Sequence, residues 1–171
     1  MNTTTMQTFS GKLIDLAKFT HLDVRLTDIS HALSMINRFT GHSTSPYSVA
    51  QHSVHVSRLL PDDLALWGLL HDASEAYLGD VATPLKSLLP CYQEIEERVQ
   101  RAVARAFGMR WPIPEPVKLA DRAALAAEKA ALFSVQHDWG LGECMPARIG
   151  VPLPWYEAKS EFESRFKEIV K

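Results

Sequence analysis

The chain has 171 residues, of which 46% are hydrophobic and 22% are charged, a balance typical of one domain with a buried core. The formal net charge of −2 at pH 7 provides no broad basic field, so no nucleic-acid partner is expected. An anionic partner must therefore be bound by a local pocket.

The two cysteines, Cys91 and Cys144, are far apart and lack the spacing of zinc ligands, so neither a disulfide framework nor a structural zinc site is expected. Residues 1–12 contain no charged segment followed by an apolar core, and no apolar run approaches the roughly 20 residues that span a bilayer. These features predict a soluble, cytoplasmic protein with no membrane partner.

Residues 1–26 mix Thr, Ser and Gly with short apolar alternation, which predicts a loop-rich N-terminal arm, with a small hairpin as an alternative. Apolar residues at helical spacing then predict a helix that is capped by Thr27 or Asp28 and ends near Arg38 or Phe39. The following residues, 40–48, have the Gly, Ser, Thr and Pro content of a loop.

Residues 49–60 are expected to form a second helix, with Ser48 as its N-cap and Pro61 as its stop. A third helix begins at Pro61 and is so apolar that burial on most sides is expected. This third helix brings His71 and Asp72 to its end.

Tyr92–Phe107 has one apolar stripe among charged residues, which predicts an amphipathic helix that Gly108 ends. Strong helix formers follow Pro116, which is expected in the first turn of the next helix. Residues 137–154 are expected to be a loop, and a last helix to cover about 155–170.

The predicted fold class is all-α, with about six or seven helices and a loop-rich N-terminal arm at residues 1–26. No strand pattern is long enough to build a sheet, and there is no internal repeat. We expect a single domain over residues 1–171, with its core at about 27–135 and a C-terminal helix at about 155–170.

The segment from His71 to Lys86, HDASEAYLGDVATPLK, is dense in groups able to bind metal, move protons or hold phosphate. Its His-Asp pair and groups on two other predicted helices form a mixed nitrogen and oxygen set that suits a divalent ion. The strongest candidate ligands are His52, His71, Asp72 and Asp121. Adjacent residues on an ideal helix point about 100° apart, so the pair reaches one ion more easily near a helix end or a distortion of the helix. Taken singly, His52 could be a core or surface histidine and Asp121 a solvated or capping carboxylate.

Three segments, YSVAQHSVHVSRLL, LLHDASEAYLGDVATPLKSLLP and PVKLAD, together resemble the HD-domain superfamily of metal-dependent phosphohydrolases, whose pattern is H…HD…D. With NRFTGH and TPLK included, the chain is similar to bacterial and phage HD-domain proteins related to the 5′-deoxynucleotidases and to phage deoxynucleoside triphosphohydrolases. The likeness covers about residues 8–130. It implies a single HD-domain bundle and one divalent ion (Co, Mn, Zn, Fe, Ni or Mg) bound by His52, His71, Asp72 and Asp121.

No histidine lies between Asp72 and Asp121, where the binuclear members of the superfamily place additional ligands. The chain therefore resembles the mononuclear branch. His55 lies three residues after His52 on the same helix face, and we interpret it as a structural residue or a support for the ligands rather than a ligand.

Two further carboxylates, Glu75 and Asp80, match the catalytic positions of the resembled nucleotidases. Glu75 follows Asp72 by three residues, so a capping box is its alternative role. For Asp80 the alternative is a turn residue after Gly79. The resemblance favours proton transfer as the role of both carboxylates.

The resemblance also implies contacts with a phosphate and a nucleoside. Arg offers a planar fork and Lys a flexible point charge, so a set of them can bind one phosphate or follow a longer chain. Phe39 stands where the relatives typically have a Trp, which leaves discrimination of base and 2′-hydroxyl open. The candidate substrate-binding residues are Arg38, Phe39, His42, Tyr47, Lys86 and Lys118.

The predicted function is hydrolysis of the 5′-phosphoester of a (deoxy)nucleotide, a small-molecule partner, with release of nucleoside plus phosphate or tripolyphosphate. A non-catalytic nucleotide-binding HD module is the alternative from another class. Alarmone hydrolases carry HDxxED, whereas Ala76 stands here at the second acid, and cyclic-nucleotide hydrolases need the missing histidines. A metal-dependent oxygenase is a further rival. Homo-oligomers are expected, with the helix at residues 92–107 as one candidate interface.

Overall fold

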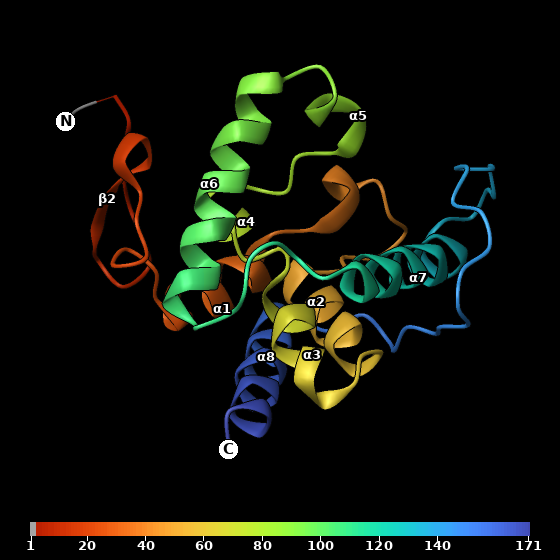
Figure 1. Cartoon of the computed structure of the whole chain (residues 1–171). Helices are drawn as coiled ribbons and strands as arrows, with labels where there is room; N and C mark the ends of the chain where they lie inside the picture. The colour runs from red at the N-terminus through yellow and green to blue at the C-terminus, as the bar shows by residue number, and fades with distance from the viewer. Residues whose placement is uncertain (1–2) are drawn as a thin grey trace.

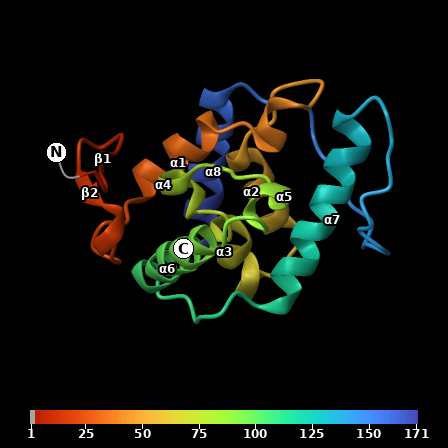
Figure 2. The same cartoon turned by 90° about the horizontal axis from the view of Figure 1, so that it is seen from above.

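The computed structural model describes residues 3–171 as a bundle of helices flanked by one small antiparallel hairpin (Figures 1 and 2). The helices of nine or more residues are α1 (Leu26–Met35), α2 (Val49–Arg58), α3 (Asp62–Leu70), α6 (Pro90–Ala106), α7 (Glu115–Leu132) and α8 (Trp155–Ile169). Shorter segments are η1 (Leu16–Lys18), η2 (Arg38–Gly41), α4 (Glu75–Leu78) and α5 (Thr83–Lys86). The predicted all-α class is confirmed.

The N-terminal arm contains the small hairpin that its apolar alternation allows. Strand β1 (Thr5–Gln7) pairs antiparallel with β2 (Leu13–Asp15), with Met6 opposite Ile14. Ile14 is buried in the main core and Met6 packs against that core, so the hairpin contacts the bundle through this pair. The expectation that no sheet forms is wrong for this one two-stranded pair.

Helix α1 is not capped by either residue that the sequence suggests. Arg25 occupies the N-cap position without a capping side-chain hydrogen bond. The Asp28 carboxylate instead accepts hydrogen bonds from the backbone N–H and the hydroxyl of Ser10, at 2.6 and 3.0 Å. The cap prediction for Thr27 or Asp28 is therefore wrong, because Asp28 fastens the hairpin to the bundle.

Helix α1 also ends earlier than predicted. Ile36 is already extended, with ψ at 121°, and Asn37 forms a β-bridge with Ser48. Arg38 to Gly41 then form a short turn in which Phe39 and Thr40 take left-handed backbone angles, φ 59° and 53°. The chain turns back here, so the predicted end near Arg38 or Phe39 is wrong.

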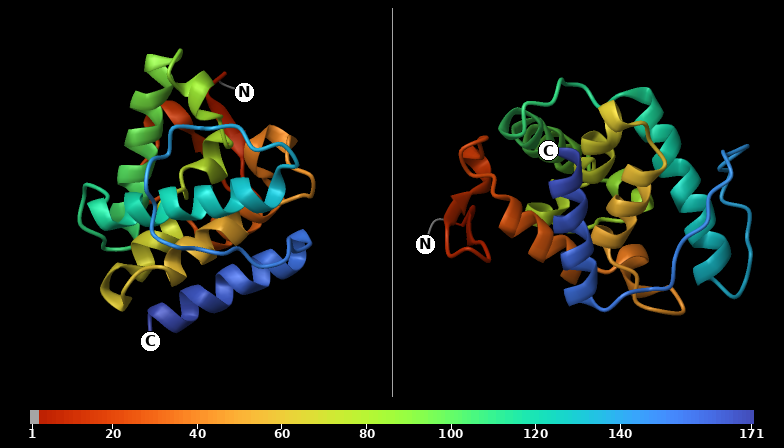
Figure 3. Two further views of the ribbon diagram at one scale, coloured as in Figure 1. Left: turned by 90° about the vertical axis from the view of Figure 1, so that its right-hand side faces the viewer. Right: turned by 90° about the horizontal axis from the view of Figure 1, so that it is seen from below.

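Helix α2 lies at the centre of the bundle and packs against α1, α3, α7 and α8 (Figure 3). Ser48 caps it as predicted, its hydroxyl accepting from Gln51 N at 3.2 Å. Helix α3 approaches α2 closely at Gly68, where an added Cβ would lie 2.8 Å from Ser57 Cα. The glycine is therefore what permits the two backbones to meet.

Helix α6 stands beside the segment that follows α3. The Gln100 side chain donates to Leu70 O at 2.7 Å and accepts from Ser74 N at 2.9 Å, so it braces the turn between them. Gly108, with φ at 67°, follows the end of this helix as predicted. Gln100 thus fixes both ends of the turn that carries His71 and Asp72.

The C-terminal part of the chain lies on the outside of the bundle. After α7 an irregular segment runs along the outside and leads to α8, which packs on α1, α2 and α3 (Figure 3). No helix among the described residues is long and apolar enough to cross a membrane. Residues 1 and 2 lie outside the described residues, so a single domain over 1–171 stays a prediction.

Candidate metal centre and catalytic site

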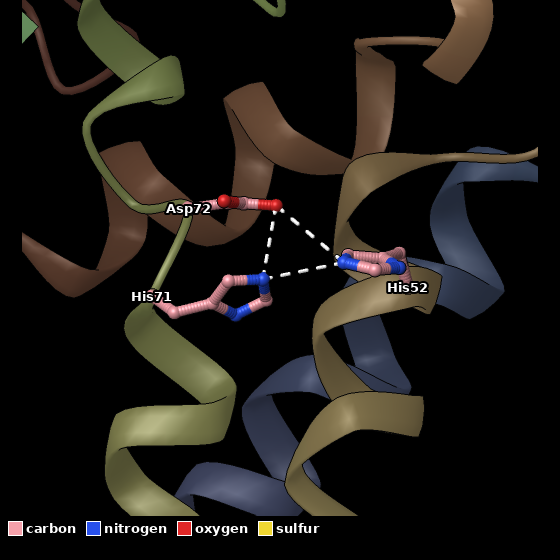
Figure 4. A group of neighbouring side chains, drawn as sticks. All are labelled: His52, His71 and Asp72. Atoms are coloured by element: carbon pink, nitrogen blue, oxygen red, sulfur yellow. Dashed lines mark hydrogen bonds and ion pairs between the residues drawn. The ribbon is translucent and has the colours of Figure 1, made fainter. Parts of the chain in front are cut away.

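Three helices deliver the four predicted ligands to one place. His52 lies on α2 and is fully buried, and Asp121 lies on α7. His71 is the C-cap of α3 and Asp72 is in the turn that follows, so the adjacent pair is freed from the 100° separation of an ideal helix. Figure 4 shows His52, His71 and Asp72 pointing toward one another.

The donor groups of His52, His71 and Asp72 are spaced as ligands of one ion would be, and Asp121 Oδ1 lies beside the two histidines. His52 Nε2 lies 3.2 Å from His71 Nε2 and 3.5 Å from Asp72 Oδ2. His71 Nε2 lies 3.1 Å from the same Asp72 oxygen. Asp121 Oδ1 lies 3.1 Å from His52 Nε2 and 3.8 Å from His71 Nε2. Ligands at 2.0–2.1 Å from a tetrahedral ion are about 3.3 Å apart, so the donor set fits a divalent metal.

Each imidazole is oriented through its other nitrogen. His71 Nδ1 lies 2.8 Å from Gly68 O, so it must donate, and Nε2 is the nitrogen that faces the cluster. His52 Nδ1 lies 2.6 Å from Glu128 Oε1. Both histidines therefore present Nε2 to the same point.

The histidines and carboxylates of the cluster shift one another's pKa values. Burial by itself lowers the pKa of His71, but the carboxylates of Asp72 and Asp121 outweigh it and hold that pKa well above its usual value. Burial by itself raises the pKa of Asp72, but His71 and His52 outweigh it and lower that pKa to about 2. The carboxylates thus stay ionised across the neutral range, as metal binding requires.

Glu75 lies at the start of α4, buried, with Oε2 making no hydrogen bond within residues 3–171. Burial and the nearby Asp72 and Asp80 carboxylates raise the pKa of Glu75 well above its usual range. Burial is also the main reason that the pKa of Asp80 is raised. A buried carboxyl oxygen without a partner is unusual, and it is available to a ligand or water.

Arg38 is the buried cation of the site. Its Nε donates to Glu128 Oε2 at 2.9 Å, and one terminal nitrogen lies 3.7 Å from Asp72 Oδ2. The Phe39 ring lies beside this guanidinium and packs edge-on against Phe133, with centroids 5.2 Å apart. The left-handed turn at Phe39 thus sets an aromatic ring next to the cation.

The two predicted lysine contacts, Lys86 and Lys118, each lie beside a carboxylate. Lys86 Nζ lies 3.9 Å from Glu75 Oε1 but 2.5 Å from Glu96 Oε1. Lys118 is exposed and pairs with Glu115 at 3.2 Å, three residues earlier on α7. For these two lysines, a role at the substrate stays a prediction.

Three further residues, His42, Tyr47 and His55, differ in how far they are buried. His42 is exposed, whereas Tyr47 is buried and its carbonyl accepts from Arg38 N at 2.9 Å. His55 is partly buried, and its Nδ1 makes no hydrogen bond within the described part of the chain. It is absent from the cluster formed by His52, His71 and Asp72.

Glu128 is the site residue that sequence reasoning missed. It lies seven residues after Asp121, two helical turns along the same face of α7, and its side chain is fully buried. That spacing is the signal that could have found it. In an alanine-rich helix, a single glutamate otherwise looks like an exposed position.

One solved structure has a fold similar to that of this chain. No family model matches the chain. The structure is similar to the cyanophage S-2L HD phosphohydrolase DatZ, described as bound to dA and one catalytic Zn²⁺ ion, with a TM-score of 0.53 and 20% identity over 86% of this chain and 96% of DatZ. The helical bundle is thus that of the HD-domain proteins.

Two bacterial proteins are similar in sequence. The uncharacterized protein YfdR of Escherichia coli is 40% identical over 168 residues, covering 96% of this chain and 94% of YfdR. The uncharacterized protein RCAP_rcc00048 of Rhodobacter capsulatus is 38% identical over 141 residues, 73% of this chain and 72% of that protein. The chain belongs to the same family as YfdR.

Proposed function

We propose that the protein is a metal-dependent phosphohydrolase that cleaves the 5′-phosphoester of a (deoxy)nucleotide. The observation that carries the proposal is the juxtaposition of three groups. They are the cluster of His52, His71 and Asp72 with Asp121 beside it, the buried Oε2 of Glu75, which makes no hydrogen bond within residues 3–171, and the buried guanidinium of Arg38. A metal centre, a proton acceptor and a cation are the three parts that hydrolysis of a phosphoester needs.

His52, His71, Asp72 and Asp121 would hold one divalent ion. The ion would polarise a phosphate oxygen and lower the pKa of water. Zinc is a suitable candidate because the donor set is mixed nitrogen and oxygen and because DatZ is described with one catalytic Zn²⁺. A mononuclear site accords with the absence of histidine between Asp72 and Asp121.

The chain's own groups would then divide the chemistry. Glu75 takes a proton from the attacking water as its oxygen bonds to phosphorus. The bond from phosphorus to O5′ breaks, and Asp80 supplies the proton to the leaving oxygen. Arg38 faces the charge that develops on the phosphoryl oxygens.

The cationic and aromatic side chains at the site support a nucleotide as the substrate. Phe39 and its aromatic neighbours offer an apolar wall beside Arg38, which suits a sugar or base. The description of DatZ with dA bound supports a nucleoside as part of the substrate. Lys86 and Lys118 are proposed to meet further phosphates, so that a triphosphate would yield nucleoside and tripolyphosphate. His42 and Tyr47 are proposed to complete the pocket.

The test is a screen of deoxy- and ribonucleoside mono-, di- and triphosphates against several divalent ions, with separation of nucleoside, phosphate and tripolyphosphate. We expect turnover for at least one nucleotide, and its loss in the Glu75→Gln variant with the metal retained. Nucleotide binding without any turnover would identify a non-catalytic HD module instead. Oxygen consumption with bound iron would identify an oxygenase. Light scattering on the same samples checks the predicted homo-oligomer.

A further inference from the structure

Glu128 occupies an unusual position behind the proposed metal centre. Its side chain is fully buried on α7, and each carboxylate oxygen has a different partner: Oε1 lies 2.6 Å from His52 Nδ1, and Oε2 accepts from Arg38 Nε at 2.9 Å. A buried carboxylate is costly unless it is paired and hydrogen-bonded. Here both oxygens are satisfied, by one imidazole and one guanidinium.

We propose that Glu128 is a positioning residue that fixes the metal ligand His52 and the phosphate-facing Arg38 at the same time. The proposal rests on the proposed function. A carboxylate at Nδ1 holds the proton there, which leaves the Nε2 lone pair for the ion and fixes the plane of the ring. His52 Nε2 points to Asp72 and Asp121, as this orientation requires.

The second half of the contact concerns Arg38. Glu128 binds Nε and leaves the terminal nitrogens for other partners, and one of them lies 3.7 Å from Asp72 Oδ2. A guanidinium has five N–H donors in a rigid fork, so fixing one edge aims the other. One buried carboxylate thus aligns the anion-binding group with the metal-binding group.

The two metal-ligating histidines differ in this respect. His71 is oriented by the backbone carbonyl of Gly68, which no side-chain substitution removes, whereas His52 is oriented by a side chain. Substitution of Glu128 therefore tests the orientation of one ligand and leaves the other contact in place.

The experiment compares Glu128→Gln with the wild-type chain by titration of Co²⁺ into metal-free protein, followed by its absorption spectrum, and by KM for the best nucleotide. Glutamine has the same size but cannot accept hydrogen bonds from both partners, since one end carries an NH₂. We expect Co²⁺ affinity to fall about 10- to 100-fold, the usual effect of losing an outer-sphere partner of a ligand. We also expect KM to rise.

Two further variants separate positioning from folding. Arg38→Ala keeps the contact between Glu128 and His52, so KM should rise while Co²⁺ affinity stays within about threefold of the wild-type value. Glu97→Gln repeats the chemical change at an exposed position on α6 and should alter neither. If Glu128→Gln fails to fold, Glu128→Asp keeps the charge but is too short to reach both partners, and the same loss of Co²⁺ affinity is expected.

The outcomes bear differently on the two proposals. A folded Glu128→Gln protein with wild-type Co²⁺ affinity would overturn the positioning role while leaving the phosphohydrolase proposal intact. Weakened Co²⁺ binding in this variant, combined with no nucleotide turnover by the wild-type chain, would support the positioning role and refute the phosphohydrolase. A wild-type chain that binds no divalent ion would refute both.

Discussion

Lys86 Nζ lies 2.5 Å from the Glu96 carboxylate, so the predicted phosphate contact on α5 is held by an acid on α6. An incoming phosphate must compete with this carboxylate for the ammonium group. Because both side chains are about a quarter exposed, the pair is worth at most about 1 kcal/mol.

Glu96→Gln is therefore expected to lower KM for the nucleotide by up to about fivefold, with kcat little changed. The effect should shrink at high salt, because screening weakens partly exposed ion pairs. Steady-state kinetics at two ionic strengths measure it, with Glu97→Gln, whose partner Arg101 lies on the exposed side of α6, as the control. An unchanged KM in Glu96→Gln would mean that Lys86 does not meet the substrate.

Asp121→Ala is expected to remove stoichiometric metal binding, although Asp121 is partly exposed and lies on a different helix from the His-Asp pair. The loss should exceed the roughly 10- to 100-fold of an outer-sphere substitution, since a ligand itself is removed. Metal analysis after gel filtration checks this. Glu115→Gln, at an exposed position on the same helix, should bind metal like the wild-type chain, and full occupancy in Asp121→Ala would exclude Asp121 as a ligand.

The order and spacing of residues predicted the helices that carry the site. Apolar residues and the flanking Pro61 located α2 and α3 to within a few residues, and the strong helix formers after Pro116 located α7. The apolar run after Pro61 was predicted to bring His71 and Asp72 to a helix end, and α3 does end there. These features are local, so a local pattern encodes them.

What the sequence did not predict depends on contacts between distant segments. Glu128 is buried because Arg38, 90 residues earlier, lies against it. In the sequence, only its seven-residue spacing from Asp121 connects it with the site. The left-handed turn at Phe39 and Thr40 uses residues that rarely adopt this conformation, so propensity argues against it. Likewise, the sequence predicted Asp28 as a cap because its contact with Ser10, 18 residues earlier, leaves no local signal.

Gly68→Ala is expected to destabilise the protein by about 1–3 kcal/mol or more, the cost of overpacking. The new Cβ would lie 2.8 Å from Ser57 Cα, so α3 must move away from α2. Because the Gly68 carbonyl orients His71, metal affinity should fall as well. Urea denaturation of the metal-free protein measures the stability, with Gly150→Ala as the control, since a Cβ there meets open space. Equal stability of the two variants would contradict the close approach of the helices.

Glu75→Gln is expected to separate stability from activity. Burial and the neighbouring carboxylates raise the pKa of Glu75, so the folded protein binds more protons than the unfolded chain between the ordinary and the raised pKa. Stability that is fully present below the ordinary glutamate pKa is therefore lost as the pH rises toward the raised value. Glutamine carries no charge and escapes this loss.

The metal-free Glu75→Gln protein should therefore be more stable than the wild-type chain at pH 8, on the order of 1–3 kcal/mol, and similar to it at pH 4. Thermal or urea unfolding at both values checks this. Turnover should fall at least about 100-fold, the usual contribution of a general base, while metal affinity is kept. If the variant instead lost stability at pH 8 and kept its turnover, Glu75 would have a structural role and would not be the general base.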